Sequence, residues 1–280
     1  MANLRQMLKS RQLHRLADRI ISAAEKSVRL QAGKRSAQAT SRLGGRPNLP
    51  PAMKWPKWRE EPLAFVAQLD LSSIPKIPGL PLPNIGTLLF FFEGGETARG
   101  YDPKHQGSTV VVYSPDPLAN LPLRALPAEL PDHLRFHGVE LRPEEMETTI
   151  PSFDHPLFAE LKATPEEREA YYDVQLEWNA DSPATIHRIG GHPDSIQGDP
   201  KLIAQLVAHG LYCGDSSGYQ KGEKLRLWPG AVDWQLLFQV DSDERAKMMW
   251  GDVGRLYFLI HKTALSKKQF DKTWVIFQCS

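Results

Sequence analysis

The sequence predicts an α+β fold that is internally duplicated, with mostly antiparallel sheets, peripheral helices and a basic amphipathic helix at the N-terminus. Two observations lead to this class. Apolar, strand-like segments of the same form occur in the same order in both halves of the chain, and the helical signals lie between them or at the N-terminus. Regular alternation of strands and helices would predict a parallel sheet instead, so this separation favours α+β.

The composition is that of a globular chain long enough to bury a substantial core. The 280 residues are 41% hydrophobic and 24% charged, and the net charge is +1. No window holds 18 apolar residues, and the N-terminus lacks the apolar core of a secretory signal. The two cysteines, Cys213 and Cys279, are too few for a disulfide framework or a zinc cluster. We therefore expect a cytoplasmic protein.

Residues 1–36 are expected to form the basic amphipathic helix. Nine Lys and Arg residues stand against Asp18 and Glu25 in residues 1–35, a charge of +7 that leaves −6 for the rest of the chain. The apolar positions recur every fourth residue, which is typical of one helical stripe. They are Leu4, Leu8, Leu16, Ile20, Ala24 and Val28. We expect the stripe to pack on the acidic body of the protein. Peripheral membrane contact through residues 1–35 is the alternative, and nucleic acid binding is not favoured.

Two related motifs mark the single domain that we expect over residues 37–280. Each has two glycines, one variable residue and a proline, and follows an apolar residue. The motif residues are Gly44, Gly45, Arg46 and Pro47 in the first copy, and Gly190, Gly191, His192 and Pro193 in the second. Paired glycines adopt positive φ or let another backbone approach closely, and the proline fixes the exit direction. We interpret both motifs as matching structural loops.

The segments after the two motifs also correspond. "FVAQLDL" (65–71) and "LLFQVDSD" (236–243) are apolar strands interrupted by one glutamine. "GTLLFFFE" (86–93) and "GRLYFLI" (254–260) then follow in the same order. Short apolar runs bounded by turn residues are typical of buried strands.

We therefore expect two pseudo-repeats, at about residues 41–115 and 186–280, joined by a variable middle segment, 116–185. Helix signals occupy 163–173 in the middle segment and 198–210 in the second repeat. Each signal begins with an N-capping residue and a proline in the first turn. The second helix lies in an insertion that the first repeat lacks.

The glutamines allow two interpretations. Gln68 and Gln239 each precede an aspartate by two residues, Asp70 and Asp241. A buried amide needs hydrogen-bond partners, and backbone groups are its usual ones. The favoured interpretation is therefore structural, with each glutamine bonded to loop backbone. The alternative is that two Gln–Asp pairs line a shared groove between the repeats.

The residues of this candidate groove are Gln68, Asp70, His192, Gln239, Asp241, Asp243, Trp250 and Asp252. Trp250 stands beside Gly251, and Gly254 follows, so this loop would allow a ligand to approach closely. Aromatic side chains are also favoured at binding hot spots, although a core position is the ordinary role of such a tryptophan.

Several of these stretches resemble the YwqG-like family, a bacterial group of domains of unknown function. The resemblance rests on "SRLGGRPNLPPAMKWP", "PLAFVAQLDL", "PNIGTLLFFFE" and "LLFQVDSDERAKMMWGDVGRLYFLI", and it runs from about residue 28 to the C-terminus. It implies an α+β fold with internal duplication. It brings no established activity, and a toxin-immunity or accessory role follows only by analogy.

Catalytic and metal motifs are weak. "GDSSG" (214–218) fits the pattern of a nucleophile elbow around Ser216, but a helix precedes it where a strand is required. Asp241, Asp243 and Asp252 are weak candidates for Ca²⁺ or Mg²⁺, yet Ala246 stands where an EF-hand needs glycine.

Histidine pairs are a further weak signal. His133 and His137 are four residues apart, and His187 and His192 flank the second glycine pair. A zinc site needs three or four ligands, and chance pairs are expected in a chain with nine histidines.

We expect neither a cofactor nor a metal, and the preferred function is a non-catalytic protein-binding module. The partner would be a toxin or a membrane-associated protein. The alternative is an enzyme, or a binder of a small molecule or metal, that uses the groove between the repeats.

Overall fold

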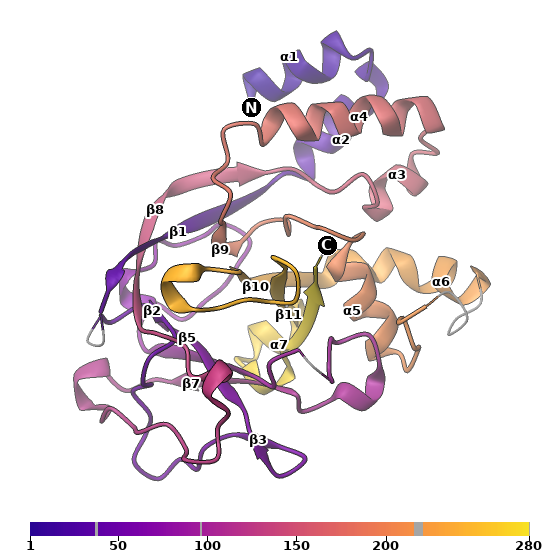
Figure 1. Ribbon diagram of the computed structural model, residues 1–280. Coiled ribbons are helices and arrows are strands. Elements are labelled where there is room, and N and C mark those ends of the chain that lie inside the picture. Colours follow the sequence, from indigo (N-terminus) through magenta and orange to yellow (C-terminus); the bar gives the residue numbers. More distant parts are fainter. Residues whose placement is uncertain (37–38, 96, 216–220, 280) are drawn as a thin grey trace.

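The computed structural model describes residues 1–36, 39–95, 97–215 and 221–279 (Figure 1). In these ranges the helices are α1 (Ala2–Ser10), α2 (His14–Ser22), α3 (Pro156–Glu160), α4 (Pro165–Trp178), α5 (Pro200–Ala208), α6 (Lys221–Leu227) and α7 (Lys262–Ser266). The strands are β1 (Glu25–Arg35), β2 (Arg42–Leu43), β3 (Lys57–Trp58), β4 (Glu61–Pro62), β5 (Ala64–Asp70), β6 (Thr87–Phe92), β7 (Thr109–Ser114), β8 (Val139–Thr149), β9 (His187–Gly190), β10 (Trp234–Asp241), β11 (Arg255–His261) and β12 (Trp274–Gln278). The α+β class is confirmed.

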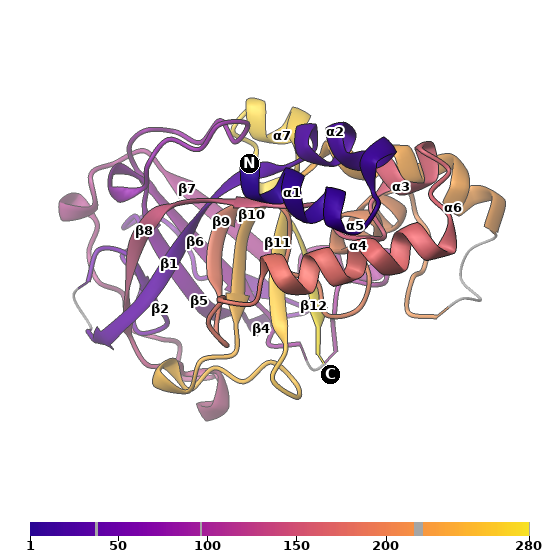
Figure 2. The ribbon, with the colours of Figure 1, turned by 90° about the horizontal axis from the view of Figure 1, so that it is seen from above.

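Ten strands form one sheet in the order β12-β11-β10-β9-β1-β8-β2-β5-β6-β7, and all its pairings are antiparallel. β1 and β8 lie at its centre, and the two wings beside them curl toward each other (Figure 2). Side chains of the two wings meet inside the curve, where the ring of Phe90 lies 5.0 Å from the rings of both Phe238 and Phe258. The main core therefore fills the concave side of the sheet.

The outer faces of both wings are covered too. Helix α5 lies over β10, β11 and β12, where it packs Ala204 near Leu236 and Tyr257. On the other wing, the chain around the β3–β4 hairpin places the Trp55 ring 5.5 Å from that of Phe91. Strands covered on both faces have continuous apolar sequences, which explains the runs from which β5, β6, β10 and β11 were predicted.

The expectation of one helix over residues 1–36 is wrong in its second half. The chain forms α1 and α2, but residues 25–35 form the long central strand β1. Val28, Leu30 and Ala32 alternate with polar residues and are buried, as in a strand with one face on the core. A spacing of four residues is also a multiple of two, so the apolar pattern did not separate helix from strand here.

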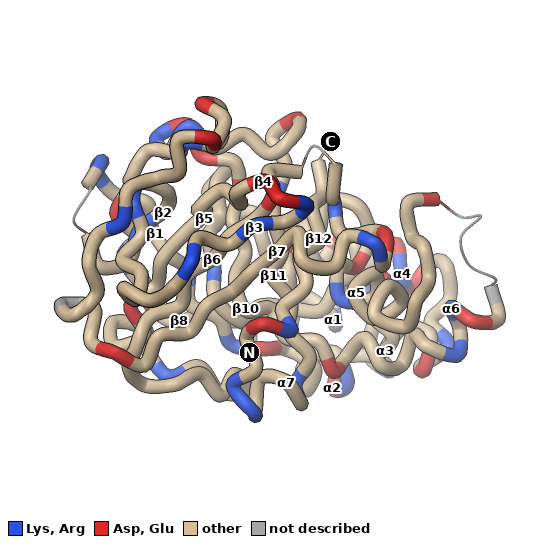
Figure 3. The backbone as a smooth tube through the Cα atoms, turned by 90° about the horizontal axis from the view of Figure 1, so that it is seen from below, with Lys and Arg blue, Asp and Glu red and all other residues tan. Residues whose placement is uncertain are grey.

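The N-terminal helices pack on α3 and α4 in a separate apolar cluster that contains Leu8, Leu16, Phe158 and Tyr171. Arginines of α2 and of the connection between α1 and α2 meet acidic residues of the middle segment. These pairs are Arg11 with Asp173, Arg15 with Glu167, and Arg19 with Glu160. The apolar stripe of α1 and α2 is therefore buried within the protein. Figure 3 shows acidic and basic residues interspersed along the backbone. Among the described residues, no helix has the length and apolar character needed to cross a bilayer.

The helices of the insertion and of the middle segment are confirmed. Thr164 and Glu167 form a reciprocal capping box at the start of α4, as their spacing predicts. Asp199 caps α5 by accepting a hydrogen bond from the backbone N–H of Lys201, at 2.8 Å. Both helices start at a proline, so the first-turn signals located their N-termini.

The predicted duplication stays a prediction, and the sheet order is consistent with it. On one side of the centre, β8 is followed outward by β2, β5, β6 and β7. On the other side, β1 is followed outward by β9, β10, β11 and β12. Each glycine motif directly follows or overlaps the short strand of its wing, β2 or β9. The segments that the predicted duplication matches therefore lie at corresponding positions in the two wings.

Candidate functional site

The two glycine motifs form tight corners beside the central strands. Gly44 and Gly45 have φ of +50° and +73°, and Gly190 and Gly191 have +72° and +76°. A Cβ on Gly44 would lie 2.6 Å from a backbone oxygen, and one on Gly191 would lie 2.5 Å from Oγ1 of Thr149. Both the dihedral angles and the close approach thus require glycine.

Gln68 and Gln239 bind these corners in the same way. Both are fully buried. Oε1 of Gln68 accepts from the backbone N–H of Asn48, and Oε1 of Gln239 accepts from that of Asp194, each directly after the motif proline. The Nε2 groups donate to backbone oxygens just before each motif. These contacts agree with the structural interpretation of the glutamines.

The acidic groove candidates lie in different places. Asp70 caps a short 3-10 helix of its own wing. Asp241 accepts from the backbone N–H of Ile186 at 2.7 Å and pairs with Arg255 at 2.8 Å. Asp243 receives two hydrogen bonds from the guanidinium of Arg245, at 2.9 and 2.6 Å, and one from its backbone N–H, at 2.9 Å. Burial raises the pKa of Asp241.

Burial also opposes ionisation of Asp243, but its hydrogen bonds with His187 and Arg245 outweigh that effect and hold its pKa below the usual value. His187 lies 3.2 Å from this carboxylate, through Nε2. The buried carboxylates Asp241 and Asp243 thus belong to a structural network at the C-terminal end of β10. No group of three or more acidic, His or Cys ligands suited to a metal ion occurs within the described residues.

Trp250 is in the core, 1% exposed, with its ring 5.3 Å from that of Phe136. It also lines a cavity of about 650 Å³ between the wings, together with Arg99 and Phe277. Gly251 has a φ of +55°. Asp252 is exposed on the following turn. Of the groove candidates, only Trp250 takes part in this cavity.

Gly254 packs closely, since a Cβ there would lie 2.3 Å from a backbone oxygen. Ser216 of the elbow pattern lies outside the described residues.

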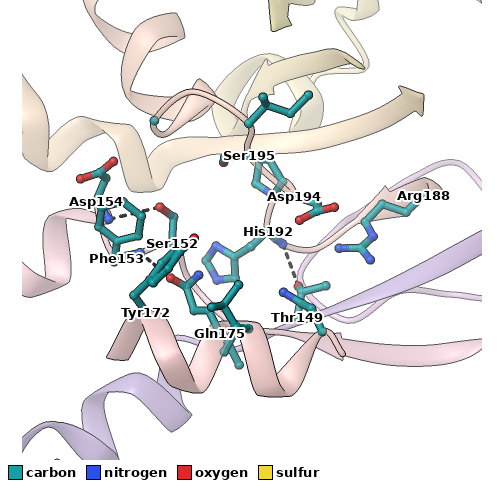
Figure 4. A pocket seen from close by; sticks show the side chains of 16 residues that line it. Thr149, Ser152, Phe153, Asp154, Tyr172, Gln175, Arg188, His192, Asp194 and Ser195 are labelled. Atoms are coloured by element: carbon teal, nitrogen blue, oxygen red, sulfur yellow. Dashed lines mark hydrogen bonds between the residues drawn. The ribbon is translucent and has the colours of Figure 1, made fainter. Parts of the chain in front are cut away.

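His192 lines a different cavity, of about 640 Å³, between α4 and the loop that joins β9 to α5 (Figure 4). We call it the α4 cavity. Phe153, Tyr172 and Gln175 lie on one side of it, while Arg188 and Asp194 lie on the other. The full lining is Thr149, Ile150, Ser152, Phe153, Asp154, Tyr172, Gln175, Leu176, Asn179, Arg188, His192, Pro193, Asp194, Ser195, Ile196 and Gly198.

Arg188 is the basic residue on the side of the α4 cavity opposite the aromatic rings. It is 4% exposed, and Nη2 lies 3.0 Å from the carboxylate of Glu147. Its Nε is buried without a hydrogen-bond partner, as is Oγ of Ser195. Burial lowers the pKa of Arg188. A buried guanidinium with an unmatched donor is costly, so this position favours an additional acceptor or anion.

Arg42 occupies the corresponding position in the first corner, two residues before Gly44 as Arg188 is two before Gly190. Its guanidinium donates to the backbone oxygens of Ala39 and Arg46 and to the side chains of Asn48 and Gln68. The first corner thus supplies acceptors to Nη1 and Nη2 of its own arginine, while Nε is buried without a partner, as it is in Arg188. At the second corner, the arginine faces a cavity instead.

A buried polar cluster lies next to the α4 cavity. Nε2 of His192 lies 2.7 Å from the backbone oxygen of Ala23, and Lys201 pairs with Glu25 at 3.1 Å. Burial lowers the pKa of His192 to about 4, and burial together with His192 and Lys201 lowers that of His155 to about 3. Both imidazoles are therefore neutral at pH 7. His155 and Glu25 also line a neighbouring cavity of about 730 Å³.

The rim of the α4 cavity is apolar. Phe153 and Tyr172 form an edge-to-face pair with ring centroids 5.7 Å apart. These two rings are 36% and 47% exposed, and Leu176, one turn further along α4, is 55% exposed. A few polar groups placed beside aromatic and apolar side chains are usual in a small-molecule site.

Residues 41–279 match a family model described as a domain of unknown function (DUF1963). The chain belongs to this family. The match covers both wings of the sheet and the middle segment that forms α3 and α4, so every residue lining the α4 cavity lies within the DUF1963 region. None of the curated proteins matches the chain.

Sequence reasoning found His192 but missed Arg188, Tyr172 and most of the lining. A signal for Arg188 was present, because an arginine precedes both glycine pairs at the same spacing. Nothing comparable marked Phe153 or Tyr172, because they line the cavity only when the middle segment packs beside the loop that follows β9.

Proposed function

We propose that this DUF1963 domain is a non-catalytic binding protein whose ligand occupies the α4 cavity. A volume of about 640 Å³ is suited to a small ligand or a short chain segment. The charged groups on the Arg188 side of the cavity already take part in contacts that hold the fold together, as in the pairing of Asp194 with Arg255. They are therefore suited to recognition on a rigid scaffold.

The contrast between the two corners carries the proposal. At the same scaffold position, Nη1 and Nη2 of Arg42 have four acceptors inside the protein, whereas Arg188 has one ionic contact and lines a cavity. Nε is buried without a hydrogen-bond partner in both arginines. If Arg188 served only to fix the corner, the arrangement around Arg42 would be the better solution. The second corner therefore leaves a buried charged group beside a cavity at the cost of local stability.

A ligand screen tests this proposal. Fragments of varied charge and polarity should include binders that raise the melting temperature. Their affinity should fall at least about tenfold in Arg188→Gln and in Tyr172→Ala. Glu169→Ala, an exposed position on the same helix, is the matched control and should leave affinity unchanged. The proposal would be contradicted if both cavity substitutions left the affinity of every binder unchanged, or if the screen gave no binders.

A protein partner is the second candidate function, and the exposed rim favours it. Phe153, Tyr172 and Leu176 together form an apolar patch of the kind used at interfaces. We retain a toxin or a membrane-associated protein as the proposed partner, and the YwqG-like name with its immunity role as the narrower interpretation. A partner that uses this rim should be displaced by a ligand of the α4 cavity. If such a ligand does not displace the partner, the interface lies elsewhere on the protein.

A further inference from the structure

We propose that the α4 cavity recognises a carboxylate that carries an adjoining apolar or aromatic group. The inference rests on the function proposed above and names the chemical class of its ligand. Three features carry it: the charges around Arg188, the pairing of Asp194, and the position of the aromatic rim.

The first feature is a shared counter-ion. The Glu147 carboxylate contacts two guanidinium groups, Arg29 at 2.5 Å and Arg188 at 3.0 Å. It also accepts a hydrogen bond from Ser27. Nε atoms of both arginines are buried without partners. Glu144 approaches Arg29 only to 3.8 Å, and its side chain is 38% exposed, so water screens it. Arg188, which is buried, and Arg29, whose side chain is 25% exposed, thus share one close anion, which leaves room for one more negative charge beside Arg188.

The second feature limits that charge. Asp194 also lines the cavity, and although its carboxylate pairs with Arg255, a strongly negative ligand would be repelled by it. A monoanion supplies the missing negative charge near Arg188 and is repelled less by Asp194 than a phosphate dianion would be. Among monoanions, the planar carboxylate matches the planar donor arrangement of a guanidinium group.

The third feature is the rim. The Phe153–Tyr172 pair lies across the cavity from Arg188, as Figure 4 shows. A ligand whose carboxylate reaches Arg188 therefore places its next atoms beside two aromatic rings. Burial of an apolar group there adds to the affinity that the charge supplies. Free aromatic or aliphatic acids have this chemistry, and so does the C-terminus of a polypeptide that ends in an apolar residue.

Calorimetric titration with matched acids and amides tests the inference. The probes are 3-phenylpropanoate with 3-phenylpropanamide, and acetyl-Ala-Phe with its C-terminal amide. Each acid should bind at least about tenfold more tightly than its amide, because a charge-assisted contact to Arg188 is lost in the amide. Tighter binding of the peptide acid would assign a polypeptide C-terminus, and tighter binding of the simple acid would assign a small molecule.

Variants of the full chain separate charge recognition from general damage. Arg188→Gln should abolish the preference for acid over amide, and Tyr172→Ala should weaken acid and amide alike. If Arg188→Gln does not fold, Arg188→Lys serves instead, and it should retain part of the preference because the charge remains. Equal affinity of acid and amide in the unaltered protein would overturn the inference.

Different results would overturn the proposed binding site and the proposed carboxylate class. Neutral or cationic fragments whose binding depends on Arg188 and Tyr172, with acids excluded, would overturn the carboxylate class but support the binding site. If no fragment of any charge binds there, both proposals are overturned.

Discussion

Acidification from pH 7 to pH 4 is expected to lower the free energy of unfolding by about 4 kcal/mol or more. The cause is the buried cluster of His155, His192, Lys201 and Glu25. Burial lowers the pKa of His192 to about 4, and burial with the nearby cations lowers that of His155 to about 3. In the unfolded chain both imidazoles titrate near the ordinary value of about 6.5. The unfolded state thus binds more protons between these pH values, and stability falls as the pH decreases from about 6.5 toward 3.

Burial would raise the pKa of Glu25, but Lys201 and His192 lower it, so its contribution is also lost in acid. Urea denaturation at pH 7, 5 and 4 measures the effect. The double variant His155→Asn and His192→Gln should flatten the pH dependence between pH 6.5 and 4. His14→Gln, at an exposed position, should leave the profile unchanged. An unaltered profile in the double variant would show that other groups cause the acid sensitivity.

Replacement of Arg42 by Met is expected to destabilise the protein by about 3 to 5 kcal/mol. Arg42 is 1% exposed, and its guanidinium donates to four acceptors in the first corner. Methionine fills much of the volume but offers no donor, so buried oxygens of the backbone, Asn48 and Gln68 lose a partner. Burial lowers the pKa of Arg42 to about 10, so the side chain is still charged at pH 7.

Arg188→Met is the matched control at the second corner. It should cost less, about 2 kcal/mol at most, because Glu147 keeps its contacts with Arg29 and Ser27. Urea denaturation of both variants at pH 7 measures the difference. An equal or larger loss for Arg188→Met would mean that this arginine has the same structural role as Arg42.

Much of the fold was predictable because its signals are local. The apolar runs around Gln68 and Gln239 need cover on both faces wherever they lie, and Thr164 with Glu167 can form a capping box without help from distant residues. β1 was not predictable in this way. It lies at the centre of the sheet through pairing with β8, more than 100 residues away in sequence, and its apolar spacing also fits a helix.

The candidate site was predictable only in part for the same reason. His192 attracted attention because it differs from Arg46 in an otherwise matching motif. The carboxylates of the predicted groove proved to be dispersed, since Asp70 and Asp252 lie on separate turns while Asp241 and Asp243 are paired with arginines. Aspartates after strands cap turns and bind backbone amides as readily as they bind ligands, and sequence alone does not separate these roles.

The most direct test of the central claim is a ¹H–¹⁵N correlation spectrum of the full chain, titrated with the best binder from the fragment screen. A ligand in the α4 cavity should shift the signals of residues around Thr149, Tyr172 and Asp194, and Arg188→Gln should abolish those shifts. The signals around Trp250, which lines the cavity between the wings, should not move. Shifts centred on Trp250, without shifts at the residues that line the α4 cavity, would contradict the account.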